Sequence, residues 1–236
     1  MRIIITRPLE RAKPLEKKLE ELGVEMLLAP MLKIENCAFE VPEGPLQALI
    51  FTSVQGVEAT AGYDSLHIFP ALTVGSKTAE AAAKAGFQTV YNADGDVEAL
   101  YDLILEKGNT GKGLLLHLAG EQTTGNLVER LQEKGFQAER RKVYIANAAD
   151  SLPASVLEKI RARAVDAVLF FSTRTAHIFN QIARENSLED ALGRAFTLCL
   201  SENIASEAKK LPWKKVLVAD NPTEQSMIDL LRGLRK

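Results

Sequence analysis

The sequence predicts an α/β protein with two doubly wound parallel-sheet domains that are related by internal duplication. Residues 48–87 contain a buried apolar strand, a hydroxyl residue at its exit, a helix, and the same series again. Residues 167–213 repeat this order, and a shorter unit at 3–30 returns at 114–145. Apolar strands that alternate with amphipathic helices are typical of open sheets covered by helices on both faces.

Composition sets the class of protein. The chain has 236 residues, 46% of them hydrophobic, and a net charge of −2, which suits one large domain or two of about 100 residues. This charge gives no basic surface for nucleic acid. Cys37 and Cys199 follow no metal or redox spacing, so we expect reduced thiols. The first apolar run is too short for a signal peptide or membrane span, so we expect no membrane partner and a cytoplasmic location.

The first short unit begins with a buried strand at Ile3–Ile5 and a turn at Thr6–Pro8. Leu15, Leu19 and Leu22 follow at helical spacing, which predicts a helix with one packed stripe. Gly23 fits as the residue that ends this helix. The chain then returns as a second strand at 26–30.

The second short unit follows the same plan. Residues 114–118 match the first strand, and 143–145 match the returning strand. Between them Leu127, Leu131 and Gly135 stand at a constant offset from Leu15, Leu19 and Gly23. Twofold repetition of this kind indicates duplication of one α/β module.

Two segments with a different pattern mark the domain boundaries. Residues 32–35 and 142–145 alternate polar and apolar side chains, as half-exposed strands do. Irregular stretches rich in Pro, Gly, Asp and Asn follow each of them. We therefore predict one discontinuous domain at 1–35 and 149–236 and a second domain at 36–148. The linkers lie near 33–45 and 143–153.

The turns after the strands carry Ser, Thr, Asn or Asp almost without exception. Such residues cap helices whatever the function. Two opposed rims of free N–H groups and hydroxyls would also make a cleft suited to carboxylates. Both interpretations stay open at this point.

Several chemistries are disfavoured. Residues 108–113 contain Gly-Lys but lack the first glycine of a phosphate loop and precede a strand. The three histidines lack the spacing of a zinc helix, and His117 in its apolar strand has the position of a core residue. No Ser stands in a nucleophile elbow. The sequence thus offers no evident nucleophile, metal site or cofactor site.

Five motifs together resemble uroporphyrinogen-III synthases. These are Ile5-Thr6-Arg7-Pro8, Leu49-Ile50-Phe51-Thr52-Ser53, Val74-Gly75-Ser76-Lys77-Thr78-Ala79, Gly135 ahead of Val143-Tyr144, and Phe170-Phe171-Ser172. The resemblance covers essentially the whole chain. It implies two flavodoxin-like domains joined by a two-stranded β-ladder. It also implies an enzyme that closes hydroxymethylbilane to uroporphyrinogen III with loss of water and inversion of ring D, and that needs no cofactor.

The resemblance also implies site residues. Tyr144 matches the family tyrosine and is a candidate general acid, although a tyrosine on a linker strand can be simply amphipathic. The candidate substrate-binding residues are Arg7, Ser53, Ser76, Lys77, Thr78, Ser172, Arg174 and Ser201. For the hydroxyls the competing role is helix capping, and for the basic residues it is solvation. We expect a monomer whose partner is the polycarboxylate hydroxymethylbilane. The alternative is a two-domain small-molecule binding or sensor protein without turnover.

Overall fold

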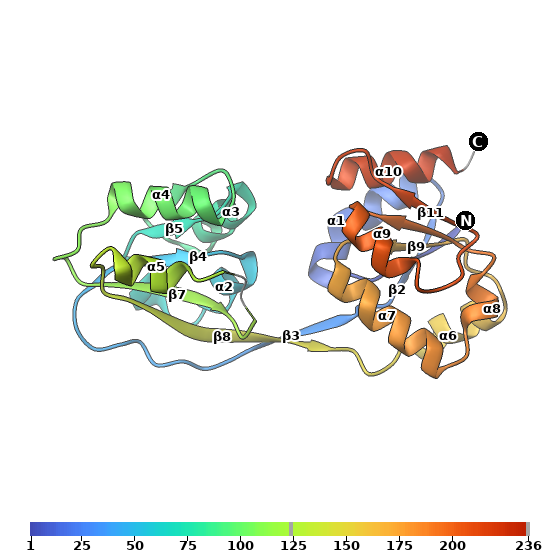
Figure 1. The fold of residues 1–236 in the computed structure, drawn as a ribbon, viewed down its shortest axis with the longest axis horizontal. Helices are drawn as coiled ribbons and strands as arrows, with labels where there is room; N and C mark the ends of the chain where they lie inside the picture. The colour runs from blue at the N-terminus through green and yellow to red at the C-terminus, as the bar shows by residue number, and fades with distance from the viewer. Residues whose placement is uncertain (123–124, 235–236) are drawn as a thin grey trace. The chain divides into compact units, whose positions relative to one another are not determined.

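The computed structural model describes residues 1–122 and 125–234, which form two compact units. Unit 1 comprises residues 1–33 and the chain from Asn147 onward, and unit 2 comprises residues 34–146. Each unit is a sheet flanked by helices (Figure 1). The domain boundaries at 35/36 and 148/149 stay a prediction, because the units are defined by contacts in the folded chain and not by independent folding.

Unit 1 contains a five-stranded sheet in the order β11-β10-β9-β1-β2, and every neighbouring pair in it is parallel. Its strands are β1 (Arg2–Ile5), β2 (Glu25–Leu28), β9 (Ala167–Phe170), β10 (Phe196–Cys199) and β11 (Lys215–Val218). Its helices are α1 (Leu9–Glu21), α6 (Ala154–Arg161), α7 (Thr173–Glu185), α8 (Glu189–Leu192), α9 (Glu202–Ala208) and α10 (Glu224–Gly233).

Both faces of this sheet are buried. On one face Ile3 and Ile5 pack with residues of α1 and α10, and on the other face Ile4 packs with residues of α6 to α9. The sheet is therefore doubly wound, as the sequence predicts. Leu15 and Leu19 of α1 are fully buried, and burial of each such side chain contributes about 1.5–3 kcal/mol. Gly23 follows this helix with a φ of 60°, as its predicted role requires.

Unit 2 contains a six-stranded sheet in the order β3-β8-β7-β4-β5-β6. Its strands are β3 (Leu32–Asn36), β4 (Leu46–Phe51), β5 (Ala71–Thr73), β6 (Val90–Asn92), β7 (Leu114–Gly120) and β8 (Ala138–Ala148). Its helices are α2 (Val54–Glu58), the short 3₁₀ helix η1 (Asp64–Leu66), α3 (Ser76–Ala85), α4 (Val97–Lys107) and α5 (Leu127–Glu133). The two segments predicted as half-exposed strands are neighbours here, as β3 and part of β8.

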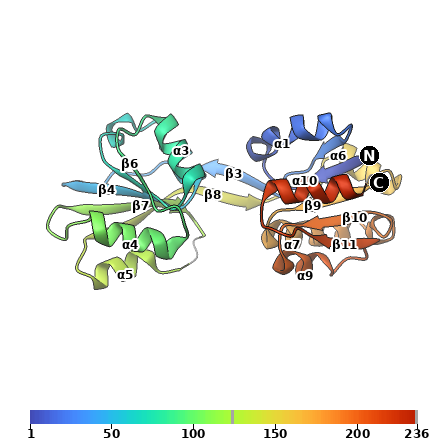
Figure 2. The same cartoon turned by 90° about the horizontal axis from the view of Figure 1, so that it is seen from above.

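The helices of unit 2 also cover two faces (Figure 2). Residues of α4 and α5 pack with Ile50 and Leu115 on one face. Residues of α2 and α3 pack with Phe51 and Leu116 on the other face. Polar side chains that follow β4 and β7 therefore emerge at the carboxyl edge, between the sheet and the helices.

The two sheets have corresponding strand orders. Each sheet places three consecutive strands beside a consecutive pair: β11-β10-β9 beside β1-β2 in unit 1, and β6-β5-β4 beside β7-β8 in unit 2, with β3 added at the edge. The pair comes before the three strands in the sequence of unit 1 and after them in that of unit 2. Duplication of one module predicts this correspondence. Among the described residues, no helix is both long and apolar enough to span a membrane.

Candidate active site

A pocket of about 470 Å³ lies in unit 2 at the carboxyl ends of β4 and β7. This edge is where open α/β sheets bind ligands. The polar side chains in its lining include those of Thr52, Ser53, His117, Arg140 and Tyr144. Helices α4 and α5 add apolar wall residues, namely Val97, Leu127 and Val128. The pocket thus combines hydroxyl groups, a cation and the carboxylate of Glu129 with an apolar wall.

The Tyr144 side chain crosses the end of β7 to reach the turn after β4. Its phenol oxygen lies 3.1 Å from Ser53 Oγ. A Cβ at Gly120 would come within 2.6–2.9 Å of the Tyr144 ring and hydroxyl. The pairing of β7 with β8 shifts register between Ala119 and Gly120, which places Gly120 opposite Tyr144. Glycine at this position therefore leaves the space in which the Tyr144 ring lies.

Ser53 is held by the start of α2. It is the N-cap of that helix, and its hydroxyl accepts a hydrogen bond from the Gly56 N–H at 3.2 Å. Helix α2 approaches β7 closely, since a Cβ at Gly56 would lie 2.5 Å from the Leu118 carbonyl oxygen. Ser53 therefore caps α2 and contacts Tyr144 at the same time.

His117 lies beside this pair on the α4 and α5 face of the sheet. It is 4% exposed, and its Nε2 is 3.1 Å from Thr52 Oγ1. In the parallel register Ile50 and Arg140 flank His117 on either side, and Thr52 follows two residues after Ile50. Burial, reinforced by the positive charge of Arg140, lowers the pKa of His117 from 6.5 to about 4. The imidazole is therefore neutral at pH 7.

The other unit 2 candidates lie at the start of α3, outside the lining of this pocket. Ser76 is exposed; its hydroxyl donates to Asp94 Oδ1 at 2.8 Å and accepts from Asn92 at 3.2 Å. Lys77 is exposed, and Thr78 is buried at 5% exposure. The N-cap of α3 is Gly75, which has no side chain to cap the helix. Helix capping therefore does not account for Ser76 or Thr78.

Three of the unit 1 candidates lie at the ends of β9 and β10. Ser172 caps α7, because its hydroxyl accepts from the Thr175 N–H at 3.2 Å. Arg174 is half-buried in the first turn of the same helix. Ser201 is the N-cap residue of α9 but makes no side-chain capping bond. Capping thus explains Ser172 and not Ser201.

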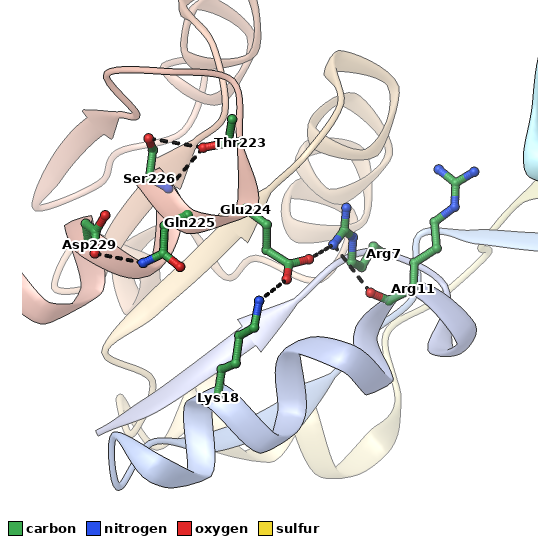
Figure 3. Close-up of polar contacts among 8 residues, drawn as sticks. All are labelled: Arg7, Arg11, Lys18, Thr223, Glu224, Gln225, Ser226 and Asp229. Carbon is green, nitrogen blue, oxygen red and sulfur yellow. Dashed lines mark hydrogen bonds and ion pairs between the residues drawn. The ribbon is translucent and has the colours of Figure 1, made fainter. Parts of the chain in front are cut away.

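Arg7 is held within unit 1 by an internal carboxylate (Figure 3). Its Nη1 is 3.0 Å from Glu224 Oε2, at the start of α10, and its guanidinium lies over the Phe171 ring at 3.9 Å. Lys18 of α1 contacts the other Glu224 oxygen at 3.1 Å. Burial lowers the pKa of Arg7, although the Glu224 carboxylate opposes this shift. The Nε of Arg7 is buried and makes no hydrogen bond to the residues that the structure describes.

The structure separates the predicted site residues into groups. Ser53 and Tyr144 lie together in the pocket, whereas Ser76, Lys77 and Thr78 lie at the start of α3. Within residues 1–122 and 125–234, no group of three or more His, Cys, Asp or Glu side chains is placed to hold a metal ion. Burial raises the pKa of the Cys199 thiol to about 11, so it is a poor nucleophile at neutral pH.

Sequence reasoning misses three pocket residues. Thr52 belongs to one of the motifs but is not among the predicted site residues. His117 has the position of a core residue in the sequence, and Arg140 belongs to none of the motifs. His117 is indeed buried, but it also lines the pocket. The sequence does show a polar residue in an otherwise apolar strand. Its partner Thr52 is 65 positions away, and only the strand register brings them together.

One family model matches most of the chain, and solved structures share its fold. The model of the family "Uroporphyrinogen-III synthase HemD" matches residues 13–229. Uroporphyrinogen-III synthetase from Helicobacter pylori is similar in structure, with a TM-score of 0.67, 18% identity and coverage of 100% of both chains. A mutant uroporphyrinogen III synthase from Thermus thermophilus has a TM-score of 0.54 and 19% identity, covering 100% of this chain and 97% of that one. No curated protein sequence matches the chain.

Proposed function

The chain belongs to the uroporphyrinogen-III synthase HemD family, and from this premise we propose which of its residues act in the reaction. The activity is that of the family: it is a hydro-lyase of haem biosynthesis that cyclises hydroxymethylbilane to uroporphyrinogen III. What the family does not give is the role of individual side chains in this chain. We propose these roles on the basis of the geometry of the pocket in unit 2.

The observation that carries the proposal is the Tyr144–Ser53 contact above Gly120. The Tyr144 phenol lies at the C-terminal end of β7, 3.1 Å from the Ser53 hydroxyl. A hydrogen bond from the first turn of α2 holds this hydroxyl in place. A proton donor held in this way can meet a leaving group without reorganisation. We therefore assign Tyr144 as the general acid and Ser53 as the residue that orients its hydroxyl.

The reaction places modest demands on the protein. The Tyr144 O–H gives its proton to the departing hydroxyl of the substrate, the carbon–oxygen bond breaks, and water leaves. The proton that the closing macrocycle loses from its pyrrole carbon restores the phenol, so the enzyme ends as it began. The main task is to fold the linear tetrapyrrole so that its last ring inverts before closure, which is catalysis by positioning.

Binding of the polycarboxylate substrate is the second part of the proposal. Within the pocket the hydroxyls of Thr52 and Ser53 and the Arg140 guanidinium suit a substrate carboxylate. Ser76, Lys77, Thr78, Ser172, Arg174, Ser201 and Arg7 stay proposed substrate contacts. Arg7 is the weakest of these candidates because its guanidinium already pairs with the Glu224 carboxylate. The monomeric state and cytoplasmic location belong to the same proposal.

The proposed function is tested with freshly made hydroxymethylbilane. We expect the purified protein to form uroporphyrinogen III, detected as the type III porphyrin after oxidation and chromatographic separation of isomers. A protein that only binds the tetrapyrrole would leave the spontaneous type I product unchanged. That outcome would favour the sensor alternative.

A further inference from the structure

His117 is a buried polar residue for which the proposed mechanism has no use. It stands on β7 at 4% exposure, between the sheet and the helices α4 and α5. Its Nε2 lies 3.1 Å from Thr52 Oγ1, and both residues line the pocket. Thr52 in turn directly precedes Ser53, the partner of Tyr144. The imidazole is thus one hydrogen bond away from the place where a ligand would sit.

The tautomer of His117 decides what Thr52 presents to the pocket. If Nε2 carries the proton, it donates to Thr52 Oγ1, and the Thr52 proton is free to point into the pocket. If Nε2 is unprotonated, the Thr52 hydroxyl donates its proton to Nε2. Thr52 then presents only its oxygen lone pairs to a ligand in the pocket. A carboxylate accepts hydrogen bonds and cannot donate them. Only the first arrangement therefore suits an anionic ligand.

We propose that His117 is a positioning residue for substrate binding: its Nε2–H donates to Thr52 Oγ1 and thereby directs the Thr52 hydroxyl proton toward a carboxylate of the substrate. The inference rests on the proposed function, because it takes the ligand to be the polycarboxylate tetrapyrrole. It assigns His117 no proton transfer in the chemistry. The imidazole acts through Thr52 alone.

The surroundings of His117 keep its imidazole neutral. Burial and the Arg140 guanidinium on the adjacent strand lower its pKa to about 4. The other titratable groups of the pocket are Glu129 on α5 and Tyr144 on β8. An imidazolium would also donate through Nε2, but it would place a second cation beside Arg140 in a buried site. A neutral Nε2–H donor avoids this cost.

The tautomer can be measured without any assay of turnover. Nitrogen-15 NMR of the full chain with labelled histidine separates protonated from bare ring nitrogens, and loss of one signal set in His117→Gln assigns the residue. We expect His117 at pH 7 to be neutral with its proton on Nε2. A proton on Nδ1 instead would overturn the proposal.

Kinetics supply the second test through a double-mutant cycle. We expect Thr52→Val to raise KM for hydroxymethylbilane by about tenfold to a hundredfold, the cost of one hydrogen bond to a charged group. His117→Leu should raise KM as well, but the double variant should be no worse than Thr52→Val alone, because both changes remove one interaction. His117→Gln keeps a donor near the same place and should recover part of the loss. Additive effects would overturn the proposal.

A matched control uses another histidine of the same unit. His67 is outside the pocket lining, so His67→Gln should leave KM and kcat unchanged. The wild-type product is identified first. If it is not the type III isomer, the proposed function fails, whereas type III product together with an Nδ1–H tautomer or an additive cycle refutes only the role of His117.

Discussion

At the scale of single residues, the phenol of Tyr144 makes the sharpest prediction. Tyr144→Phe removes the proposed proton donor and its contact with Ser53. We expect kcat to fall about 100-fold, within the usual range for a general acid, while the loss of one partly buried hydrogen bond costs only about 1 kcal/mol of stability. Steady-state kinetics and thermal unfolding measure the two effects. Tyr91→Phe, on the exposed strand β6, is the control, and equal kinetics for both variants would remove Tyr144 from the mechanism.

His117 makes a prediction about pH and stability. Its pKa is about 4 in the folded chain against 6.5 ordinarily, so between these values the unfolded chain binds a proton here that the folded chain does not. Stability therefore falls as the pH falls from 6.5 to 4, by up to about 3 kcal/mol. His117→Gln should remove this pH dependence. The free energy of unfolding, measured by denaturant titration at about pH 7 and about pH 4.5, should therefore fall less with acid in the variant than in the wild type. Parallel losses for the two proteins would show that His117 does not carry this pH dependence.

At the scale of elements, the crossing of β7 by Tyr144 depends on Gly120. Gly120→Ala places a methyl group within 2.6–2.9 Å of the Tyr144 side chain, which the ring can relieve only by moving away from Ser53. We expect a stability loss of about 1–3 kcal/mol from overpacking and a drop in kcat similar to that of Tyr144→Phe. Gly62→Ala is the matched control, because no atom lies within 4 Å of its new Cβ. Normal turnover in Gly120→Ala would show that the Tyr144–Ser53 contact is dispensable.

The pair between Arg7 and Glu224 joins the turn after β1 to the start of α10, which lie near opposite ends of the sequence. The side chains are 18% and 24% exposed, and Lys18 of α1 adds a second cation. We expect Glu224→Gln to lower the free energy of unfolding by about 1–3 kcal/mol, because it leaves the half-buried Arg7 without its counter-charge. Asp229→Asn breaks the exposed pair with Arg232, whose side chains are more than half exposed, and should cost less than about 1 kcal/mol. Equal losses in denaturant unfolding would show that the Arg7 pair is no more than a surface contact.

At the scale of the whole molecule, the fold follows from patterns that are local in the sequence. Continuous apolar runs such as Ile3–Ile5 and 48–51 form central strands because parallel sheets bury both faces. Gly23 and Ser53 take the helix-end positions that their backbone and side-chain chemistry favour. These features need no knowledge of distant partners. The α/β class with helices on both faces of parallel sheets is therefore predictable.

The site is predictable only in part, because it depends on register and on long-range pairs. Ser53 and Tyr144 are identified through motifs, yet their contact arises from a register shift at Gly120 that no local pattern shows. Arg7, which stays a proposed substrate contact, also pairs with Glu224, 217 positions away, and no local pattern shows this pair. Polar residues after strands have several possible partners, and packing of the folded chain selects among them.

The central claim is that this chain directs ring closure to the inverted isomer. The most direct measurement is the isomer composition of porphyrin formed from fresh hydroxymethylbilane, as a function of protein concentration. We expect the type III fraction to rise with protein and the spontaneous type I product to be suppressed. A type I product at every protein concentration, from protein shown by circular dichroism to be folded, would contradict the claim.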